Sequence, residues 1–464
     1  FDGDGAILMH EGALAVNASK HLNNFKHIVF NNEAHDSVGS QPTTMGGVDL
    51  KNLALNSGYG KTWSVKNKKE LLKVLPKFIA HKGTALLEIK VKCGARADLG
   101  RPKEKPWENK KLFMENLNQV EFCYNGAIEN LSPVLKSNNA KKVLVFRGRS
   151  SFDSIKSMVE PQLKGMKVTY YSDFSTNPKK EEVEKAINKL GSKFDMIVAI
   201  GGGSVMDFAK AYRYYIMDSN AEKSARNKIK LIAVPTTCGT GAESTQFAVV
   251  YVDWVKTSLD KKSILPDYAI VDSRFCENSS KYLKACTAMD AYCQAIESFW
   301  AVKATSDSRE YAREAIKLCR ENLVDYVNNT NADNSANMAL ASHLAGKAIN
   351  ISRTTASHAI SYKITSDYGI PHGHAVALTI AQLYEKNLET GRFDELKELI
   401  ADDGHSYFTK LFDSIDLESD FGKLNIVDID SIVENVNIDR LSNNPVNLTK
   451  DDIRNFFRVA VLEK

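Results

Sequence analysis

The chain has 464 residues, of which 43% are hydrophobic and 25% charged, and its formal net charge is +4. This length exceeds one compact core and predicts two or three domains, while the composition excludes a disordered or fibrous protein. A charge spread so thinly argues against nucleic acid or a membrane surface as partner, and no run of about 18 apolar residues is present to span a membrane.

The cysteines and the start of the chain carry two further expectations. Seven scattered cysteines without a C-x-x-C pair indicate reduced thiols and a cytoplasmic location, and no signal peptide precedes the first residue. The chain opens with FDGDG, without an initiator methionine and inside what the pattern indicates is a buried strand. We therefore expect a fragment of a longer protein.

The first part of the chain alternates strand-like and helix-like stretches. Strands are expected at residues 26–30 and 85–91, and a helix with apolar spacing of the α-helical period is expected at 68–80. This alternation predicts a parallel sheet covered by helices. Residues 100–111 hold two prolines among charges without apolar periodicity, which predicts a surface linker.

A second alternating series follows, and it ends in helices. Its strands are expected at residues 141–146, 167–171, 195–200 and 230–235, which predicts a second, doubly wound parallel sheet. From about Lys281 onward long amphipathic patterns, such as residues 308–327, predict an all-helical remainder. The fold class is therefore α/β, with domains expected over residues 1–117, 118–278 and 279–464.

The first chemical motif is GDG at residues 3–5, followed by NN at residues 31–32. A glycine-flanked aspartate at a strand end can approach a diphosphate-bound cation closely. An asparagine at the end of the next strand can supply a second oxygen, the ligand type that Mg²⁺ prefers. The alternative reading is two ordinary turns.

The sequence around this motif resembles that of a known enzyme family. DGDGAILMHEGALAVNASK, NFKHIVFNNEAHDSVGSQPT and ARADLGRP resemble the diphosphate-binding domain of thiamine diphosphate enzymes, closely that of phosphonopyruvate decarboxylases, over residues 1 to about 115. The resemblance implies bound thiamine diphosphate and Mg²⁺. By position, the implied Mg²⁺ ligands are Asp4, Asn32 and the carbonyl of Ala34, with Gly3 and Gly5 giving the diphosphate room.

What this first module lacks limits its expected activity. The family builds its active site with an earlier pyrimidine-binding domain, whose glutamate activates the cofactor, and nothing in this sequence corresponds to it. The module alone is therefore not expected to decarboxylate a substrate. It also lacks its own first strand and helix, which predicts an incomplete sheet with an exposed edge that invites pairing with another chain.

The second motif is AIGGGSVMDFAKAYRYY at residues 199–215. Glycines between a strand and a helix permit close backbone approach to a pyrophosphate, and the helix N-terminus adds free N–H groups; Ser204 is a candidate N-cap or phosphate contact. A plain strand-to-helix turn also uses glycine. The hydroxyl-rich loop VPTTCGTGAESTQF at residues 234–247 follows another strand, and two such loops at successive strand ends favour a dinucleotide.

Several motifs in register carry a second resemblance. GGGSVMD, PTTCGTGAE, LPDYAIVD, AMDAYCQAIES and PHGHA occur in the order found in the iron-dependent alcohol dehydrogenase family, which the chain resembles over residues 119–464. The resemblance implies a nicotinamide dinucleotide. By position, its implied contacts are Gly201, Gly202, Gly203, Ser204, Asp207, Thr236, Thr237, Thr240 and Lys256.

The same resemblance implies a metal site. In the family an aspartate, a histidine four residues later, and two histidines fourteen apart hold the metal. Asp290 fits the first position, and His358 and His372 have the last spacing. Residues four apart share a helix face, so Asp290 and residue 294 could hold one ion. Residue 294 is Gln294, whose amide oxygen is a weaker ligand than imidazole, so the divalent ion stays open between iron, zinc and another metal.

Two further positions are expected to act in catalysis. Tyr362 stands where the family has another histidine, and His374 follows His372 by two residues. We expect His374 to hydrogen-bond the substrate or to relay a proton to the alkoxide. The alternative for His374 is a solvated loop residue.

The sequence segments that flank the metal-site motifs resemble one branch of the family. CQAIESFWAV and HAISYKITSDYGIPHGHAVAL resemble the phosphonoacetaldehyde reductase branch, and a phosphonate needs cationic and hydroxyl donors near the metal. Arg353, as a phosphonate clamp, and Thr354 are the implied substrate contacts, beside Thr355 and Lys363. Their alternative is plain helix surface, which we favour for Lys363.

The nicotinamide type follows from the residues after the first strand of the second module. Arg147 and Arg149 stand where the family often has an acidic residue that favours NAD, and they suit a 2′-phosphate. We expect NADPH, with NADH as the alternative. The alternative reading of these arginines is two solvated side chains in a turn.

The predicted function joins both resemblances. It is a metal-dependent NAD(P)H-linked aldehyde reductase that takes phosphonoacetaldehyde to 2-hydroxyethylphosphonate, fused to a truncated decarboxylase module. Two alternatives stay open: the latter part of a bifunctional carboxy-lyase and reductase, or a first module that serves only for association. We expect a small phosphonate substrate, no nucleic acid or membrane partner, and a homo-oligomer, a dimer.

Overall fold

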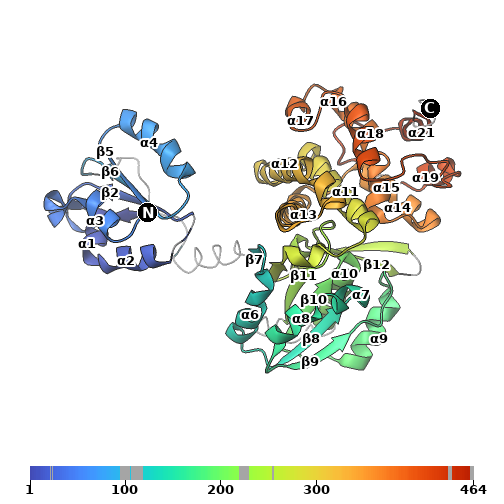
Figure 1. The fold of residues 1–464 in the computed structure, drawn as a ribbon, viewed down its shortest axis with the longest axis horizontal. Coiled ribbons are helices and arrows are strands. Elements are labelled where there is room, and N and C mark those ends of the chain that lie inside the picture. Colours follow the sequence, from blue (N-terminus) through green and yellow to red (C-terminus); the bar gives the residue numbers. More distant parts are fainter. Residues whose placement is uncertain are drawn as a thin grey trace. The chain divides into compact units, whose positions relative to one another are not determined.

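A computed structural model describes residues 1–20, 22, 24–94, 105, 119–218, 229–252, 255–436 and 441–459. The chain divides into two compact units, Phe1–Lys110 and Lys111–Lys464 (Figure 1). Each unit is described by itself. The linker expected at residues 100–111, apart from Lys105, and the domain boundary expected at 117–118 lie outside the described residues.

The first unit is built on a parallel four-stranded sheet. The strands lie in the order β1 (Asp2–Gly3), β2 (Lys26–Asn31), β6 (Ala85–Lys90) and β5 (Lys61–Val65). The connecting helices are α1 (Asp4–Met9), α2 (Gly12–Ser19), α3 (Leu50–Asn56) and α4 (Lys68–Ala80), and β3 (Ala34–His35) pairs with β4 (Gln41–Pro42). The expected strands and the helix at residues 68–80 are confirmed.

The start of this sheet differs from the buried strand expected there. β1 has two residues, both exposed, and Phe1 is 89% exposed. In the described residues β1 pairs with β2 alone, so it lies at an edge where a second strand does not cover it. The exposed edge that the sequence predicts is therefore present, while the burial expected for the strand is corrected.

The second unit begins with a parallel sheet of six strands. Their order is β7 (Val120–Cys123), β14 (Tyr268–Val271), β11 (Lys230–Pro235), β10 (Met196–Gly201), β8 (Lys142–Arg147) and β9 (Lys167–Tyr171). β10 is buried at every residue, as expected for an apolar strand covered on both faces. The chain runs from β8 outward to β9 and then returns to β10. The strand order therefore reverses between β8 and β10, where doubly wound sheets bind ligands.

Helices and one hairpin accompany this sheet. The helices are α6 (Leu131–Ser137), α7 (Ser150–Asp153), α8 (Lys156–Val159), α9 (Lys180–Leu190) and α10 (Gly203–Asp218). The antiparallel hairpin β12 (Phe247–Val252) and β13 (Val255–Asp260) was not predicted from the sequence, because no two-residue glycine turn separates its strands.

The rest of the chain is helical, as predicted. The helices are α11 (Lys281–Trp300), α12 (Ser306–Asn328), α13 (Ala332–Ser352), α14 (Ala356–Tyr368), α15 (His372–Ala377), α16 (Ile380–Leu388), α17 (Asp394–Leu399), α18 (Gly404–Ser414), α19 (Ile429–Glu434) and α21 (Lys450–Val459). Helix α11, in the middle of this domain in Figure 1, is buried along almost its whole length. No helix among the described residues is long and apolar enough to cross a membrane.

Candidate active site

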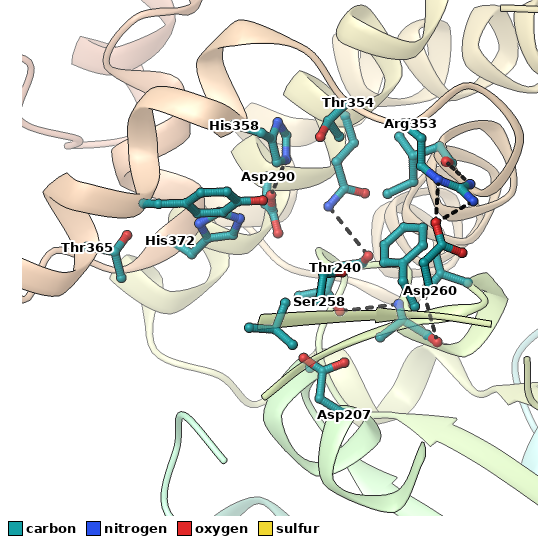
Figure 2. A pocket seen from close by; sticks show the side chains of 18 of the residues that line it. Asp207, Thr240, Ser258, Asp260, Asp290, Arg353, Thr354, His358, Thr365 and His372 are labelled. Carbon is teal, nitrogen blue, oxygen red and sulfur yellow. Dashed lines mark hydrogen bonds and ion pairs between the residues drawn. The ribbon is translucent and has the colours of Figure 1, made fainter. Parts of the chain in front are cut away.

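A cavity of about 560 Å³ has one wall from the sheet domain and one from the helical domain of the second unit. The first wall includes Asp207 of α10 and Thr240 of the loop after β11, and the second includes Asp290, His358 and His372. Figure 2 shows these side chains around a single space. Groups predicted to bind a dinucleotide and groups predicted to bind a metal therefore share one cavity.

The sheet-domain wall forms where two neighbouring strands end. Gly201 of β10 pairs with Pro235 of β11, so the loops that follow them leave the same edge of the sheet. A Cβ atom added to Gly203 would lie 2.9 Å from Cγ2 of Thr240. The glycine thus lets the two loops pack together, in addition to the room it leaves for a pyrophosphate. Ser204 donates its hydroxyl to the carbonyl of Thr176 and also lines the cavity.

The helical wall brings together three side chains from three helices. Asp290 comes from α11, His358 from α14, and His372 from the first residue of α15; their ligand atoms all lie within 4.8 Å of one another. A Cβ atom on Gly373 would lie 2.0 Å from the carbonyl oxygen of Cys286. Only glycine after His372 therefore lets α15 lie this close to α11.

A buried carboxylate holds one of the histidines. Glu297, one helical turn beyond Gln294 on α11, is fully buried. Its Oε1 accepts hydrogen bonds from Thr355 N at 3.2 Å, Thr355 Oγ1 at 2.8 Å and Ser357 N at 2.9 Å. Its Oε2 contacts Nδ1 of His358. Because Nδ1 is held by Glu297, the nitrogen of His358 that faces Asp290 is Nε2.

The atoms that face one another fit a divalent cation. In the part of the chain that the structure describes, Asp290 Oδ1, Gln294 Oε1 and His358 Nε2 are buried without a hydrogen-bond partner. A buried polar atom left in this way costs about 1–3 kcal/mol. Oxygen and imidazole nitrogen atoms are also the ligands that zinc, iron and related ions take in proteins. Asp290 Oδ1 and His358 Nε2 lie 3.4 Å apart, beyond a good hydrogen bond, so with Gln294 Oε1 they are the atoms expected of a metal site.

The pKa shifts of His358 and Asp290 also favour a cation at this position. Burial lowers the pKa of His358, but the carboxylates of Glu297 and Asp290 outweigh it and raise that pKa to about 9. Burial raises the pKa of Asp290, and His358 and His372 together bring it below its ordinary value. The cluster thus stabilises a positive charge at the place where a bound cation would supply one.

Arg353 lies at another part of the cavity, paired with a carboxylate. It follows α13 with a φ of 66°, and its Nη2 lies 2.7 Å from Oδ2 of Asp260. Its guanidinium also lies 5.4 Å from the ring centre of Phe247. Figure 2 shows the pair beside Thr354. The structure therefore places both predicted substrate contacts, Arg353 and Thr354, on the cavity wall.

Comparison with protein families identifies the second unit. Residues 121–273 match the model for iron-containing alcohol dehydrogenase, and residues 284–461 match that for the C-terminal part of the Fe-containing alcohol dehydrogenase family. Residues 121–461 belong to the iron-containing alcohol dehydrogenase family. This classification, with the ligand cluster of Asp290, His358 and His372, makes the second unit an oxidoreductase module that carries a divalent metal. Residues 1–89 match the C-terminal TPP binding domain of thiamine pyrophosphate enzymes.

Individual relatives agree with this assignment. Phosphonoacetaldehyde reductase of Streptomyces viridochromogenes is 34% identical over 211 residues, which are 42% of this chain and 53% of the relative. Long-chain-alcohol dehydrogenase 1 of Geobacillus thermodenitrificans is 29% identical and covers 55% of this chain and 68% of the relative. The chain thus spans about half to two thirds of these curated relatives.

A solved structure covers the second unit more fully. Sulfoacetaldehyde reductase from Bifidobacterium kashiwanohense in complex with NAD⁺ superposes with a TM-score of 0.68 at 26% identity. The match covers 75% of this chain and 98% of that chain. The iron-containing alcohol dehydrogenase fold is therefore present at nearly the length of that relative.

Both positions that depart from the family's ligands lie beside the cluster. Gln294 donates its Nε2 to the carbonyl of Thr240 at 3.4 Å, which leaves Oε1 for a cation. Tyr362 lines the cavity and stacks on His372, with ring centres 6.0 Å apart. The substituted residues therefore keep their places at the site and change its ligand atoms.

The structure does not bring His374 to the cavity. Its Nδ1 lies 3.0 Å from the hydroxyl of Tyr282 and its Nε2 lies 2.7 Å from the carbonyl oxygen of Glu418. The residue is buried in α15 and does not line the cavity. This corrects the expected role in substrate binding or proton relay, because residues two apart on a helix do not face the same side. The solvated-loop alternative is corrected as well.

The other predicted dinucleotide contacts are partly placed. Thr236 and Thr237 follow β11, but neither they nor Gly201 and Gly202 line the cavity. Lys256 pairs with Tyr251 across the hairpin, and its side chain lies outside the described residues.

The two arginines predicted to bind the ribose 2′-phosphate of NADPH lie at the end of β8, beside the reversal of strand order. Arg147 lies 5.0 Å from the ring centre of Phe152 and 3.9 Å from Asp153. Arg149 donates to the carbonyl of Ser172 at 3.4 Å. Neither lines the cavity, so a role in choosing NADP over NAD stays a prediction.

In the first unit two of the predicted Mg²⁺ ligands, Asp4 and Asn32, are already hydrogen-bonded through their side chains. The carboxylate of Asp4 accepts from Thr43 at 2.5 Å. Asn32 donates to Asp36 at 2.7 Å, and its oxygen accepts from Ala34 N at 3.1 Å. The amide oxygen of Asn32 keeps a second lone pair that a cation could use, and Mg²⁺ binding stays a prediction.

The two glycines of the GDG motif differ in their surroundings. A Cβ atom on Gly5 would lie 2.4 Å from the ring of His35, so Gly5 is required by packing within the module. Around Gly3 there is open space, which agrees with the room expected there for a diphosphate.

Sequence reasoning missed three residues of the site. Glu297 could have been found, because it lies seven residues after Asp290 on the same face of an apolar helix, where an unpaired acid is rare. Asp260 and Lys303 also line the cavity. They come from a hairpin and an interhelical turn, and no sequence spacing connects them to the metal ligands.

Proposed function

We propose that the chain is a metal-dependent, NAD(P)H-linked aldehyde reductase that converts phosphonoacetaldehyde to 2-hydroxyethylphosphonate. The observation that carries the proposal is the single cavity shared by the ligand cluster Asp290, His358 and His372 and by the dinucleotide loops around Thr240. The named relatives, one a phosphonoacetaldehyde reductase and one bound to NAD⁺, support it.

Different residues of the cavity are proposed to bind the metal, orient the nicotinamide and donate the proton. Asp290, His358 and His372, with Oε1 of Gln294, would hold the cation, which supplies Lewis-acid polarisation of the aldehyde carbonyl when bound. The wall with Asp207 and Thr240 would orient the nicotinamide, so that a hydride passes to the carbonyl carbon. The carbonyl oxygen takes up one proton, and the Tyr362 hydroxyl beside His372 is the proposed donor.

Several finer assignments belong to this proposal. Arg353 and Thr354 are proposed to contact the phosphonate, and Arg147 and Arg149 to favour NADPH over NADH. A cytoplasmic location is proposed because all seven cysteines are free thiols. We also propose a homodimer and a small phosphonate as the substrate.

The test is NADPH oxidation with phosphonoacetaldehyde. The full chain would be treated with chelator, assayed, and assayed again after individual divalent ions are added back. We expect activity to vanish with chelator and to return with at least one ion, and an Asp290→Asn variant to stay inactive. Full activity in metal-free protein, or recovery in Asp290→Asn equal to wild type, would contradict the proposal.

A second candidate function concerns the first unit. The match of residues 1–89 to a TPP binding domain favours binding of thiamine diphosphate with Mg²⁺, as the partial module of a decarboxylase. A calorimetric titration of the full chain with both compounds, with Asp4→Ala as the control, tests it. A saturable signal lost in Asp4→Ala supports cofactor binding, and no signal in wild type favours a module used only for association.

A further inference from the structure

The cations on the cavity wall differ in whether they are already paired. Apart from the two histidines of the cluster, the basic residues that line the cavity are Lys303 and Arg353, among the side chains that the structure describes. Nε and Nη2 of Arg353 lie 3.0 Å and 2.7 Å from Oδ2 of Asp260. The other oxygen of Asp260 accepts from Gln246 at 2.9 Å. The charge of Arg353 is therefore balanced within the protein.

Lys303 is placed by the turn that carries it. It lies between α11 and α12, where its backbone N–H donates to Oδ1 of Asn443 at 3.1 Å. The amide nitrogen of Asn443 donates to the carbonyls of Ser352 at 2.9 Å and Thr354 at 3.0 Å. Asn443 is 3% exposed, so one buried side chain holds the turn of Lys303 against the connection that carries Thr354.

The ammonium of Lys303 differs from the guanidinium of Arg353. Within the described ranges the ammonium makes no ion pair or hydrogen bond, and Lys303 is an exposed residue that lines the cavity. Three carboxylates, Asp207, Asp260 and Asp290, line the same cavity. Asp260 is paired with Arg353 and Asp290 belongs to the ligand cluster, so the cation that these carboxylates leave for an anionic substrate is Lys303.

We propose that Lys303 selects aldehydes whose far end carries a tetrahedral oxyanion, a phosphonate or a sulfonate. This inference rests on the proposed reductase function and names the residue that sets its substrate class. The hydroxyl of Thr354, held on the same frame by Asn443, is the second donor to the oxyanion. Lys303 binds the anion without breaking an ion pair, and Arg353, the other proposed contact, can join it only by releasing Asp260.

The kinetic test compares a charged and an uncharged aldehyde in the metal-loaded full chain with NADPH. In Lys303→Met we expect kcat/KM for phosphonoacetaldehyde to fall about tenfold, chiefly through KM, as for loss of one charge-assisted hydrogen bond. Propanal, which has no oxyanion, should be unaffected. Lys303→Arg should keep most of the activity, and Lys317→Met, an exposed position on α12 away from the cavity, should behave as wild type. Equal losses for both aldehydes, or none, would overturn the proposal.

A binding test separates this inference from the proposed function. Ethylphosphonate and ethanesulfonate cannot be reduced, so their binding to the full chain with NADP⁺ can be measured by calorimetry without turnover. We expect both to bind, more weakly in Lys303→Met, and the tighter one identifies the preferred head group. If wild type binds them through Lys303 but does not reduce phosphonoacetaldehyde, the proposed substrate fails and the anion site stands. Binding unchanged in Lys303→Met, or absent in wild type, overturns the site.

Discussion

Two buried histidines of the second unit have similar surroundings and different roles. His343, on α13, has Nδ1 2.8 Å from Ser244 Oγ and 3.2 Å from Glu243, and Nε2 3.4 Å from Glu121. Lys347 lies 2.8 Å from the same Glu121 oxygen. This cluster joins α13 to β7 and to the loop after β11.

His358 also lies between two carboxylates, Glu297 on Nδ1 and Asp290 near Nε2. In both clusters burial lowers the histidine pKa and the carboxylates raise it to about 9. The difference is that His358 faces a second imidazole, His372, and opens on a cavity. Two carboxylates around an imidazole thus make an ionic contact. A metal site needs further donor atoms that face the same space, as His372 and Oε1 of Gln294 do beside His358.

The largest expected effect comes from removing a ligand of one cluster but not of the other. Asp290→Ala should lower the reductase kcat by about a thousandfold or more, because the carbonyl would lose its polarising cation. His343→Gln should keep the metal and most of the activity, since that cluster binds no substrate. Metal content and steady-state rates of both folded variants check this. Equal losses in the two variants would erase the distinction between the clusters.

Glu297 should matter to metal binding without touching the metal. Glu297→Gln should weaken metal affinity by about 10–100-fold, because a partner that orients a ligand histidine is lost. Competition with a fluorescent chelator gives the affinity, and near-ultraviolet circular dichroism shows whether the variant is folded. Glu310→Gln, exposed on α12, is the control. Unchanged affinity in folded Glu297→Gln would remove the positioning role.

The glutamine at the fourth ligand position should set the strength of the site. Gln294→His should hold zinc about tenfold more tightly than wild type, because imidazole is a better zinc ligand than an amide oxygen. Gln294→Met should hold zinc less tightly, since it offers no oxygen. Rates of zinc transfer to a chelator compare the three proteins. If Gln294→Met retains zinc as well as wild type, Gln294 is not a ligand.

The smallest effect is expected at His343 and concerns stability. The pKa of His343 is raised from 6.5 to about 9, so the folded state favours its protonated form. That stabilisation is complete below about pH 6.5 and is lost as the pH rises through 9. The unfolding temperature of the metal-loaded second unit should therefore fall across this range, and by less in His343→Gln. Identical pH profiles would contradict the charged cluster.

Much of the fold was predictable because its signals are local. The buried strands β10 and β11 read as continuous apolar runs, and α12 begins where Thr305 caps it through Ser308. The predicted ligands Asp290, His358 and His372, whose ligand atoms the structure brings together, came from family spacing. The position of His374 was not predictable, because one sequence cannot show which face of a short buried helix meets the cavity.

The remaining parts of the site depend on long-range contacts. Lys303 and Thr354 are brought together by Asn443, which follows them by 140 and 89 residues. Arg353 meets Asp260 across two domains. Neither contact leaves a periodic trace in the sequence. In the first unit, the hydrogen bond that the Asp4 carboxylate accepts from Thr43 likewise follows from no spacing in the sequence.

The most direct test of the account is anomalous diffraction from crystals of the full chain grown with zinc and NADP⁺. We predict one zinc peak in the second unit, within bonding distance of Asp290, His358 and His372, on the wall opposite Thr240. A zinc ion bound at the His343 cluster instead, or no ion at Asp290 at saturating zinc, would contradict the account.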